Sequence, residues 1–83
     1  MIRNDAEILT KKVVAILEQE RISRHITKLQ ISKETGLSRT AYTLIVDNKN
    51  SPTLRTLFMI AGALQTDLKE VIAKAEKETK TLK

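Results

Sequence analysis

The chain has 83 residues, no cysteine and a formal net charge of +5 at pH 7. This length fits one domain with a modest core, and the lack of cysteine excludes disulfides and thiolate metal sites. No apolar run approaches the roughly 20 residues of a membrane span, and the first residues lack a signal-peptide core. We therefore expect a cytoplasmic protein with no membrane association, no metal and no cofactor.

Hydrophobic periodicity predicts helices and no strand. A first helix is expected from about Asp5 to Glu20, because apolar residues such as Leu9, Val13 and Ile16 recur on one helical face. Residues 21–26 form a connection into which this helix could continue by a turn.

A short second helix is expected over Lys28–Thr35. Thr27 and Gln30 have the spacing of a capping box at its start. Gly36 follows its end, where a left-handed backbone is easiest without a Cβ.

A third helix is expected from Arg39 to about Asp47. Ser38 precedes it as a cap, and Asn48 follows it as a left-handed terminator. The two short helices and the turn at Gly36 have the arrangement that places one helix in the DNA major groove.

Two more helices are expected after a loop over residues 49–52. Thr53 caps the fourth helix, Leu54 to about Leu64, in which Gly62 is interpreted as permitting close packing. Asp67 and Glu70 have the spacing of another capping box, and the fifth helix then runs from Leu68 to Ala75. Residues 76–83 are highly charged and are expected to fray. The fourth helix is expected to bury a broad face made of Leu54, Leu57, Phe58, Ile60, Ala61 and Leu64.

The excess positive charge lies in the middle of the chain. Between Arg21 and Arg55 there are seven basic and two acidic residues, whereas the two flanks together are neutral. A basic centre between balanced ends is typical of a surface that binds a polyanion. A solvated basic surface explains the charge by itself equally well.

A longer pattern extends from Thr27 to Ile72. Its members are Thr27-Lys28, Ile31-Ser32, Gly36-Leu37-Ser38, Tyr42, Ile45, Pro52-Thr53-Leu54, Leu57, Ile60-Ala61, Leu64 and Asp67-Leu68. This pattern resembles the Cro and phage-repressor family of helix-turn-helix regulators, the XRE-like group. The chain differs from the family pattern in having Lys28 for a frequent Gln, the large Tyr42 for Val or Ile, and Val46 and Asn48 for Glu and Gly.

The resemblance implies an all-α, compact five-helix bundle, a lambda-repressor-like DNA-binding domain. Residues 1–83 would form this single domain, with the helix-turn-helix at about residues 27–47 and the charged C-terminal end at about 76–83.

The resemblance also implies which residues meet DNA. Side chains at the start and on the outer face of the third helix would meet base edges: Arg39, Thr40, Thr43 and Leu44. The guanidinium fork of Arg39 matches the O6 and N7 acceptors of guanine. The alternatives are a surface or phosphate charge for Arg39 and a core or interface role for Leu44.

Phosphate contacts would come from the ends of the helices and the loop after the third helix. The candidates are Thr27, Lys28, Ser38, Lys49 and Asn50. For Thr27 and Ser38, capping is an alternative role that is compatible with phosphate contact.

The function that follows is a sequence-specific regulator of double-stranded DNA. A repressor that binds an inverted-repeat operator as a homodimer fits the family, as does an origin in a phage or another mobile element. The last helix, with Leu68, Ile72 and Ala75, is a candidate dimer surface, although it could equally close the core.

An antitoxin or another protein-interaction module is the alternative function, favoured by apolar Leu44 and Val46 on the reading face. An enzyme is the weakest interpretation, because there is one histidine, no cysteine and no Gly-rich phosphate loop.

Overall fold

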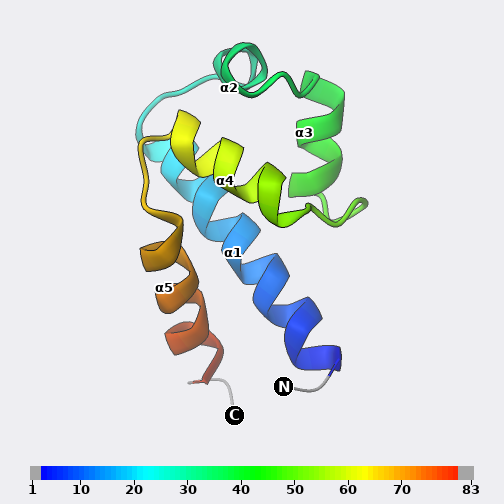
Figure 1. Ribbon diagram of the computed structural model, residues 1–83, viewed down its shortest axis with the longest axis vertical. Coiled ribbons are helices and arrows are strands. Elements are labelled where there is room, and N and C mark those ends of the chain that lie inside the picture. The colour runs from blue at the N-terminus through cyan, green and yellow to red at the C-terminus, as the bar shows by residue number, and fades with distance from the viewer. Residues whose placement is uncertain (1–2, 81–83) are drawn as a thin grey trace.

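The computed structural model describes residues 3–80, with side chains for residues 5–79. Over this range it contains five α-helices and no strand, which confirms the predicted all-α five-helix fold. The long helices α1 and α5 run side by side, and the shorter helices α2, α3 and α4 gather at one end of them (Figure 1). The helices are α1 (Arg3–Ser23), α2 (Lys28–Thr35), α3 (Arg39–Val46), α4 (Leu54–Ala63) and α5 (Leu68–Lys80).

Helix α1 continues about one turn beyond the predicted Glu20. Arg21 donates two hydrogen bonds to the Glu18 carboxylate, from Nε at 2.7 Å and from Nη2 at 2.9 Å, and this pair supports the added turn. The helix ends because His25 adopts a left-handed backbone with a φ of 58°, and the Ile26 N–H then reaches back to the Arg21 carbonyl at 3.0 Å.

Helix α5 extends to Lys80, so the prediction that the chain frays from residue 76 is wrong for residues 76–80. Two contacts explain the added turns. The Glu78 carboxylate pairs with Lys12 Nζ of α1 at 2.8 Å, and the Thr79 hydroxyl donates to the Ala75 carbonyl at 2.7 Å. Residues 81–83 of the predicted frayed end lie outside the described residues.

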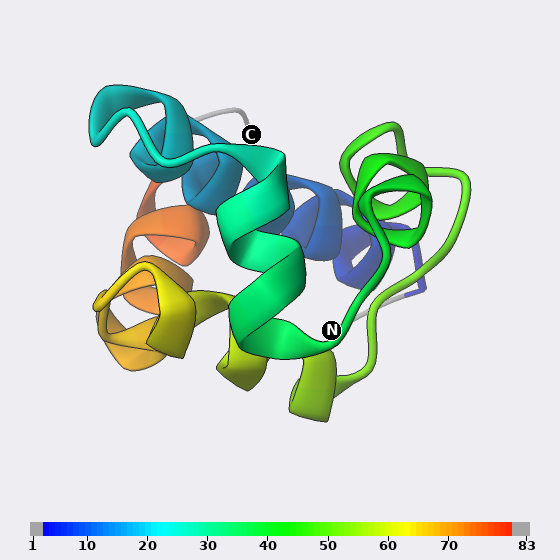
Figure 2. The same ribbon diagram turned by 90° about the horizontal axis from the view of Figure 1, so that it is seen from above.

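The predicted caps of the helix-turn-helix are confirmed. Thr27 Oγ1 accepts from the Gln30 N–H at 3.1 Å, and Gln30 Oε1 accepts in return from the Thr27 N–H at 2.7 Å. Gly36 has a φ of 81° and Asn48 a φ of 60°, both left-handed. Helix α3 ends at Val46, one residue earlier than predicted. Helices α2 and α3 lie next to each other and are joined by the turn at Gly36 (Figure 2).

The caps of the last two helices are also present. Thr53 Oγ1 accepts from the Thr56 N–H at 3.1 Å at the start of α4, which ends at Ala63, one residue before the predicted Leu64. The Asp67 carboxylate accepts from the Lys69 N–H at 3.0 Å before α5, but no bond joins the Glu70 side chain to the Asp67 N–H among the described residues, so the predicted capping box of Asp67 and Glu70 is wrong and a single cap is present.

The core is aliphatic and is centred on one aromatic ring. The largest fully buried side chains are Tyr42, Ile31 and Leu64, one each from α3, α2 and the end of α4. In α5, Leu68 and Ala75 are buried in this core, so the structure assigns them the core-closing one of their two possible roles.

Two predictions for α4 are wrong. Leu54 and Phe58 are not buried: their side chains are 61% and 58% exposed. Helix α4 presents Ile60, Ala61 and the following Leu64 to the core, and Leu54 and Phe58 lie on another face. Gly62 is exposed, and a Cβ built on it would meet no atom within 4 Å apart from the adjoining backbone of its own helix, so no close packing requires a glycine there.

Candidate nucleic-acid interface

Helix α3 has one buried face and one exposed end. Tyr42 and Ile45 are buried against the other helices, whereas Arg39 and Thr40 in the first turn are exposed. Ser38 Oγ accepts from the Ala41 N–H at 3.0 Å, and this cap fixes the direction in which α3 begins after the connection at Gly36. The two residues predicted to read bases at the start of α3 are therefore accessible and are carried on a capped helix.

The side chains of Lys28 and Thr43 meet across the two helices of the motif. Lys28 Nζ of α2 donates to Thr43 Oγ1 of α3 at 3.0 Å, and both residues are half-buried. A lysine ammonium has three donors, so this bond leaves Lys28 able to hold a phosphate while it restrains Thr43. The structure thus brings together one predicted phosphate contact and one predicted base contact.

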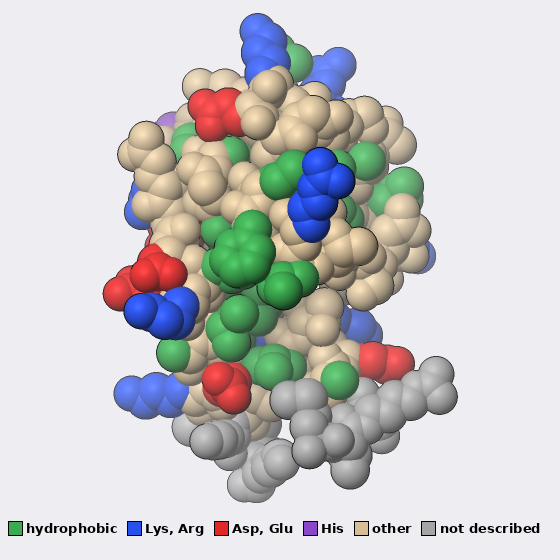
Figure 3. All heavy atoms as spheres, viewed as in Figure 1, with side chains coloured by type: hydrophobic (Ala, Val, Ile, Leu, Met, Phe, Trp, Pro, Cys, Tyr) green, Lys and Arg blue, Asp and Glu red, His purple; other side chains and the backbone are tan. Residues whose placement is uncertain are grey.

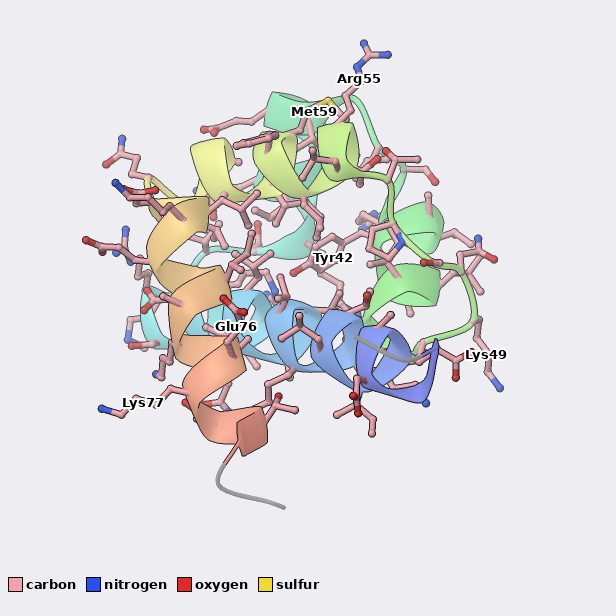
Figure 4. The ribbon with its side chains drawn as sticks, turned by 60° about the horizontal axis from the view of Figure 1, so that its bottom comes forward. Tyr42, Lys49, Arg55, Met59, Glu76 and Lys77 are labelled. Atoms are coloured by element: carbon pink, nitrogen blue, oxygen red, sulfur yellow. The ribbon has the colours of Figure 1, made fainter. Side chains whose placement is uncertain are left out.

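The loop after α3 is tied to the end of that helix. The Leu44 carbonyl accepts from the Lys49 N–H at 2.8 Å and from the Asn50 N–H at 3.2 Å. These two amides are therefore engaged within the protein, and only the exposed side chains of Lys49 and Asn50 are available to a phosphate. Lys49 projects from the edge of the molecule beside α3 (Figure 4).

Thr27 and Ser38 act as helix caps, as the sequence predicts, and both remain exposed. Each hydroxyl accepts one backbone N–H, and a hydroxyl retains a donor for another partner. Capping and phosphate contact are thus geometrically compatible at both residues.

The apolar residues of α3 are less exposed than the protein-partner hypothesis assumed. Leu44 is half-buried, and Val46 is half-buried and packs against the core. Neither forms an exposed apolar surface on the reading helix. The observation that favoured a protein partner at this helix is therefore wrong for Val46 and weakened for Leu44.

A half-buried polar network holds α3 against α1, and the sequence did not reveal it. The Tyr42 hydroxyl donates to Glu18 Oε1 at 2.6 Å, and Arg21, which holds the same carboxylate, also donates from Nη1 to the Ile26 carbonyl at 2.8 Å. The Arg21 guanidinium lies 6.0 Å from the centroid of the Tyr42 ring. One carboxylate thereby links α1, the connection before α2, and the inner face of α3; the Tyr42 side chain points into the molecule in Figure 4.

The network shifts the ionisation of its members. Burial raises the pKa of Glu18, but the hydrogen bonds from Arg21 and Tyr42 and the charges of Arg21 and Lys28 outweigh it, so this pKa lies below its ordinary value. Burial, and then the bond to Glu18, raise the pKa of the Tyr42 phenol well above its ordinary value. At neutral pH the pair is therefore a neutral phenol donating to a carboxylate.

Only part of this network had a signal in the sequence. Glu18 and Arg21 are three residues apart and can pair on one helix. A tyrosine at a core position of the motif needs a partner for its hydroxyl, but Glu18 lies 24 positions away, and only the tertiary packing shows that it is the partner.

Comparisons with known proteins agree with this architecture. A family model described as helix-turn-helix matches residues 17–71, which begins in α1 and ends in α5. Neither the comparison with curated proteins nor that with solved structures found a match.

Two searches of residues 3–80 bear on other functions. No helix there is long and apolar enough to cross a lipid bilayer. No three side chains of His, Cys, Asp or Glu gather there as a metal site would require. With its family match, its capped α2 and α3, and the exposed start of α3, the chain belongs to the XRE-type helix-turn-helix family of DNA-binding regulators, the group that includes the Cro-like and phage-repressor-like proteins.

Proposed function

We propose that the chain is a sequence-specific repressor that binds an inverted-repeat operator in double-stranded DNA as a homodimer. The observation that carries the proposal is that α3 has a buried inner face and an exposed first turn. Its inner face is fixed by the buried Tyr42, and its first turn presents Arg39 and Thr40 to solvent. A helix held in this way can enter the major groove without losing its contacts to the rest of the domain.

The roles of the side chains follow from their chemistry. Arg39 reads a guanine through two parallel hydrogen bonds. Thr40, Thr43 and Leu44 follow along the groove as hydrogen-bonding groups or as contacts to a thymine methyl. Lys28, Lys49, Asn50 and the two capping hydroxyls of Thr27 and Ser38 hold phosphates and set the register.

The first experiment selects bound sequences from a random double-stranded DNA pool and measures dissociation constants for the selected site and a scrambled site. Arg39→Ala should reduce the preference for the selected site by about tenfold to a hundredfold, the value of one good bidentate base contact. Arg39→Lys should recover little of it, because lysine is a point charge without the fork.

Lys69→Ala is the matched control, since Lys69 is an exposed cation on α5. It should leave the preference within about twofold of the unmodified chain, as expected for a surface substitution. An Arg39→Ala variant that keeps the full preference for the selected site would remove Arg39 from the reading face.

The alternative, an antitoxin or protein-interaction module, finds its support in the exposed Leu54 and Phe58 of α4 rather than in α3. Salt separates the two functions. Binding to DNA weakens steeply with added salt because counterions are released from the phosphates, whereas docking of an apolar surface does not.

A further inference from the structure

An apolar surface on α4 has no partner among residues 5–79, whose side chains the structure describes. Leu54 and Phe58 are one helical turn apart and are 61% and 58% exposed, so they present two large side chains on one side of the helix. Hydrophobic side chains continue from α4 over the region between α1 and α5 (Figure 3). Leu9 of α1 and Ile72 of α5 pack against the core and are only half-buried. We call Leu54 and Phe58, together with the hydrophobic region that continues from them in Figure 3, the α4 face.

Opposite charges flank the α4 face. Arg55 projects to solvent from the first turn of α4, and Glu76 projects from α5 at the other end (Figure 4). Both side chains are exposed, and neither takes part in an ion pair among the described residues. An apolar centre with a cation at one end and an anion at the other is complementary to a second copy of itself.

We propose that two copies of the chain associate through the α4 face about a twofold axis, with Arg55 of each copy opposite Glu76 of the other. The proposal deepens the homodimer of the proposed function by naming its surface, and to that extent it rests on that function. A twofold interface uses the same patch on both copies, so each charge pair occurs twice.

The charges also select one of two ways to join the faces. A twofold axis in the interface, running along the molecule's long axis, would set Arg55 against Arg55 and turn the two α3 helices to opposite sides of the dimer. An axis running across the molecule sets Arg55 against Glu76 and keeps both α3 helices on the same side, the right-hand side in Figure 1. This arrangement is the one that two recognition helices need to reach one face of a DNA duplex.

The size of the face predicts a weak dimer. An aromatic side chain buries about 150–250 Å², so two half-exposed apolar side chains and their rim fall short of the roughly 800 Å² per partner of a standard interface. Free chains should therefore dissociate in the micromolar to millimolar range, about 10⁻⁶ to 10⁻³ M. Two adjacent half-sites on DNA then raise the effective concentration and complete the pairing.

Sedimentation equilibrium of the whole chain without DNA, over a concentration series up to about 1 mM, tests the proposal. Phe58→Asp should weaken self-association at least about tenfold, because it places an anion in the apolar centre. Ile22→Asp is the matched control: Ile22 is 57% exposed, close to the 58% of Phe58, but lies near the end of α1. It should associate like the unmodified chain. Circular dichroism of both variants checks that they are folded.

Charge exchange tests the pairing itself. Arg55→Glu and Glu76→Arg should each weaken self-association, and the double variant should restore most of it because the pair is rebuilt with reversed sign. A chain that stays monomeric throughout the series, equal association of Phe58→Asp and Ile22→Asp, or a double variant weaker than both singles would overturn the proposal. A folded chain that binds another protein through Phe58 while staying monomeric would overturn it as well.

The test separates this inference from the proposed function. Self-association is measured without DNA, so a dimer that depends on Phe58 supports the α4 face even if the chain selects no DNA sequence. Conversely, selection of a DNA site by a chain that never dimerises would leave DNA binding intact and overturn the surface.

Discussion

Replacing Tyr42 by Phe removes one oxygen atom from the inner face of α3. The ring remains, so the volume of the core is kept, and only the 2.6 Å hydrogen bond to Glu18 is lost. Because Arg21 still donates to both oxygens of this carboxylate, the variant leaves the charge of Glu18 with a partner.

The magnitude follows from the type of bond. A hydrogen bond to a charged group contributes about 1.5–3 kcal/mol, and the remaining Arg21 contacts favour the lower half of this range. We therefore expect Tyr42→Phe to lower the free energy of unfolding by about 2 kcal/mol. For a domain of this size, that corresponds to a fall in Tm of about 8–16 °C.

Thermal and urea unfolding followed by circular dichroism measure the effect. Thr10→Val is the matched control, because it also removes one hydroxyl, which donates to the Ala6 carbonyl at 2.8 Å on the exposed side of α1. That change should stay within about 0.5 kcal/mol. A double-mutant cycle with Glu18→Gln should show coupling between Glu18 and Tyr42. If Tyr42→Phe unfolds with the same midpoint as Thr10→Val, the network does not stabilise the fold and the reasoning fails.

Two further predictions use the glycines and the single tyrosine. Gly62→Ala should stabilise the chain by about 0.5–1 kcal/mol, because the site is an open helical position. Gly36→Ala should destabilise it by about 1–3 kcal/mol, because Gly36 has a left-handed backbone. Urea unfolding midpoints that shift in the same direction for both variants would contradict this. Because folding raises the pKa of Tyr42 above its unfolded value, the stability from its neutral phenol is complete below about pH 10 and is lost as pH rises further. Tyr42 is the only tyrosine, so ultraviolet absorbance follows its ionisation alone. The phenol should ionise at a higher pH in the folded chain than in the urea-unfolded chain. Ionisation at the same pH in both would contradict the bond to Glu18.

Local signals in the sequence were sufficient for most of the fold. The capping residues Thr27, Ser38 and Thr53 and the left-handed Gly36 act within four residues of their own helix, so their roles can be deduced from spacing. The same reasoning places α2 correctly at both ends and α3 and α4 to within one residue at their C-terminal ends.

Features that depend on packing between helices could not be deduced in this way. Leu54 and Phe58 fit an apolar helical pattern, but the pattern does not show which part of a broad stripe meets the core. The extension of α5 depends on the contact between Lys12 and Glu78, and the position of α3 depends on Glu18. In the candidate site, the residue types of α3 follow from the sequence, whereas the Lys28–Thr43 bond is visible only in three dimensions.

The structure also changes the meaning of the basic segment between Arg21 and Arg55. Arg21 is paired with Glu18, and Arg24 with Glu20 at 3.0 Å and with the Leu64 carbonyl, so these two cations hold the domain together. The cations of this segment that are left to meet DNA are Lys28, Lys33, Arg39, Lys49 and Arg55.

If contact with DNA is confined to this segment, five phosphate contacts per copy is an upper bound; one fewer remains if Arg39 reads only a base, and one fewer again if Arg55 serves the α4 face. Since each neutralised phosphate contributes about 0.9 to the slope of log affinity against log salt, the slope should not exceed about 4.5 per bound copy. A titration of the selected DNA site at several salt concentrations, with the stoichiometry measured, gives this number. A steeper slope would mean either that Arg21 or Arg24 leaves its carboxylate on binding or that a cation outside this segment, such as Lys11 beside residues 48–52, joins the contact. Arg24→Gln would reduce the slope by about one only in the first case.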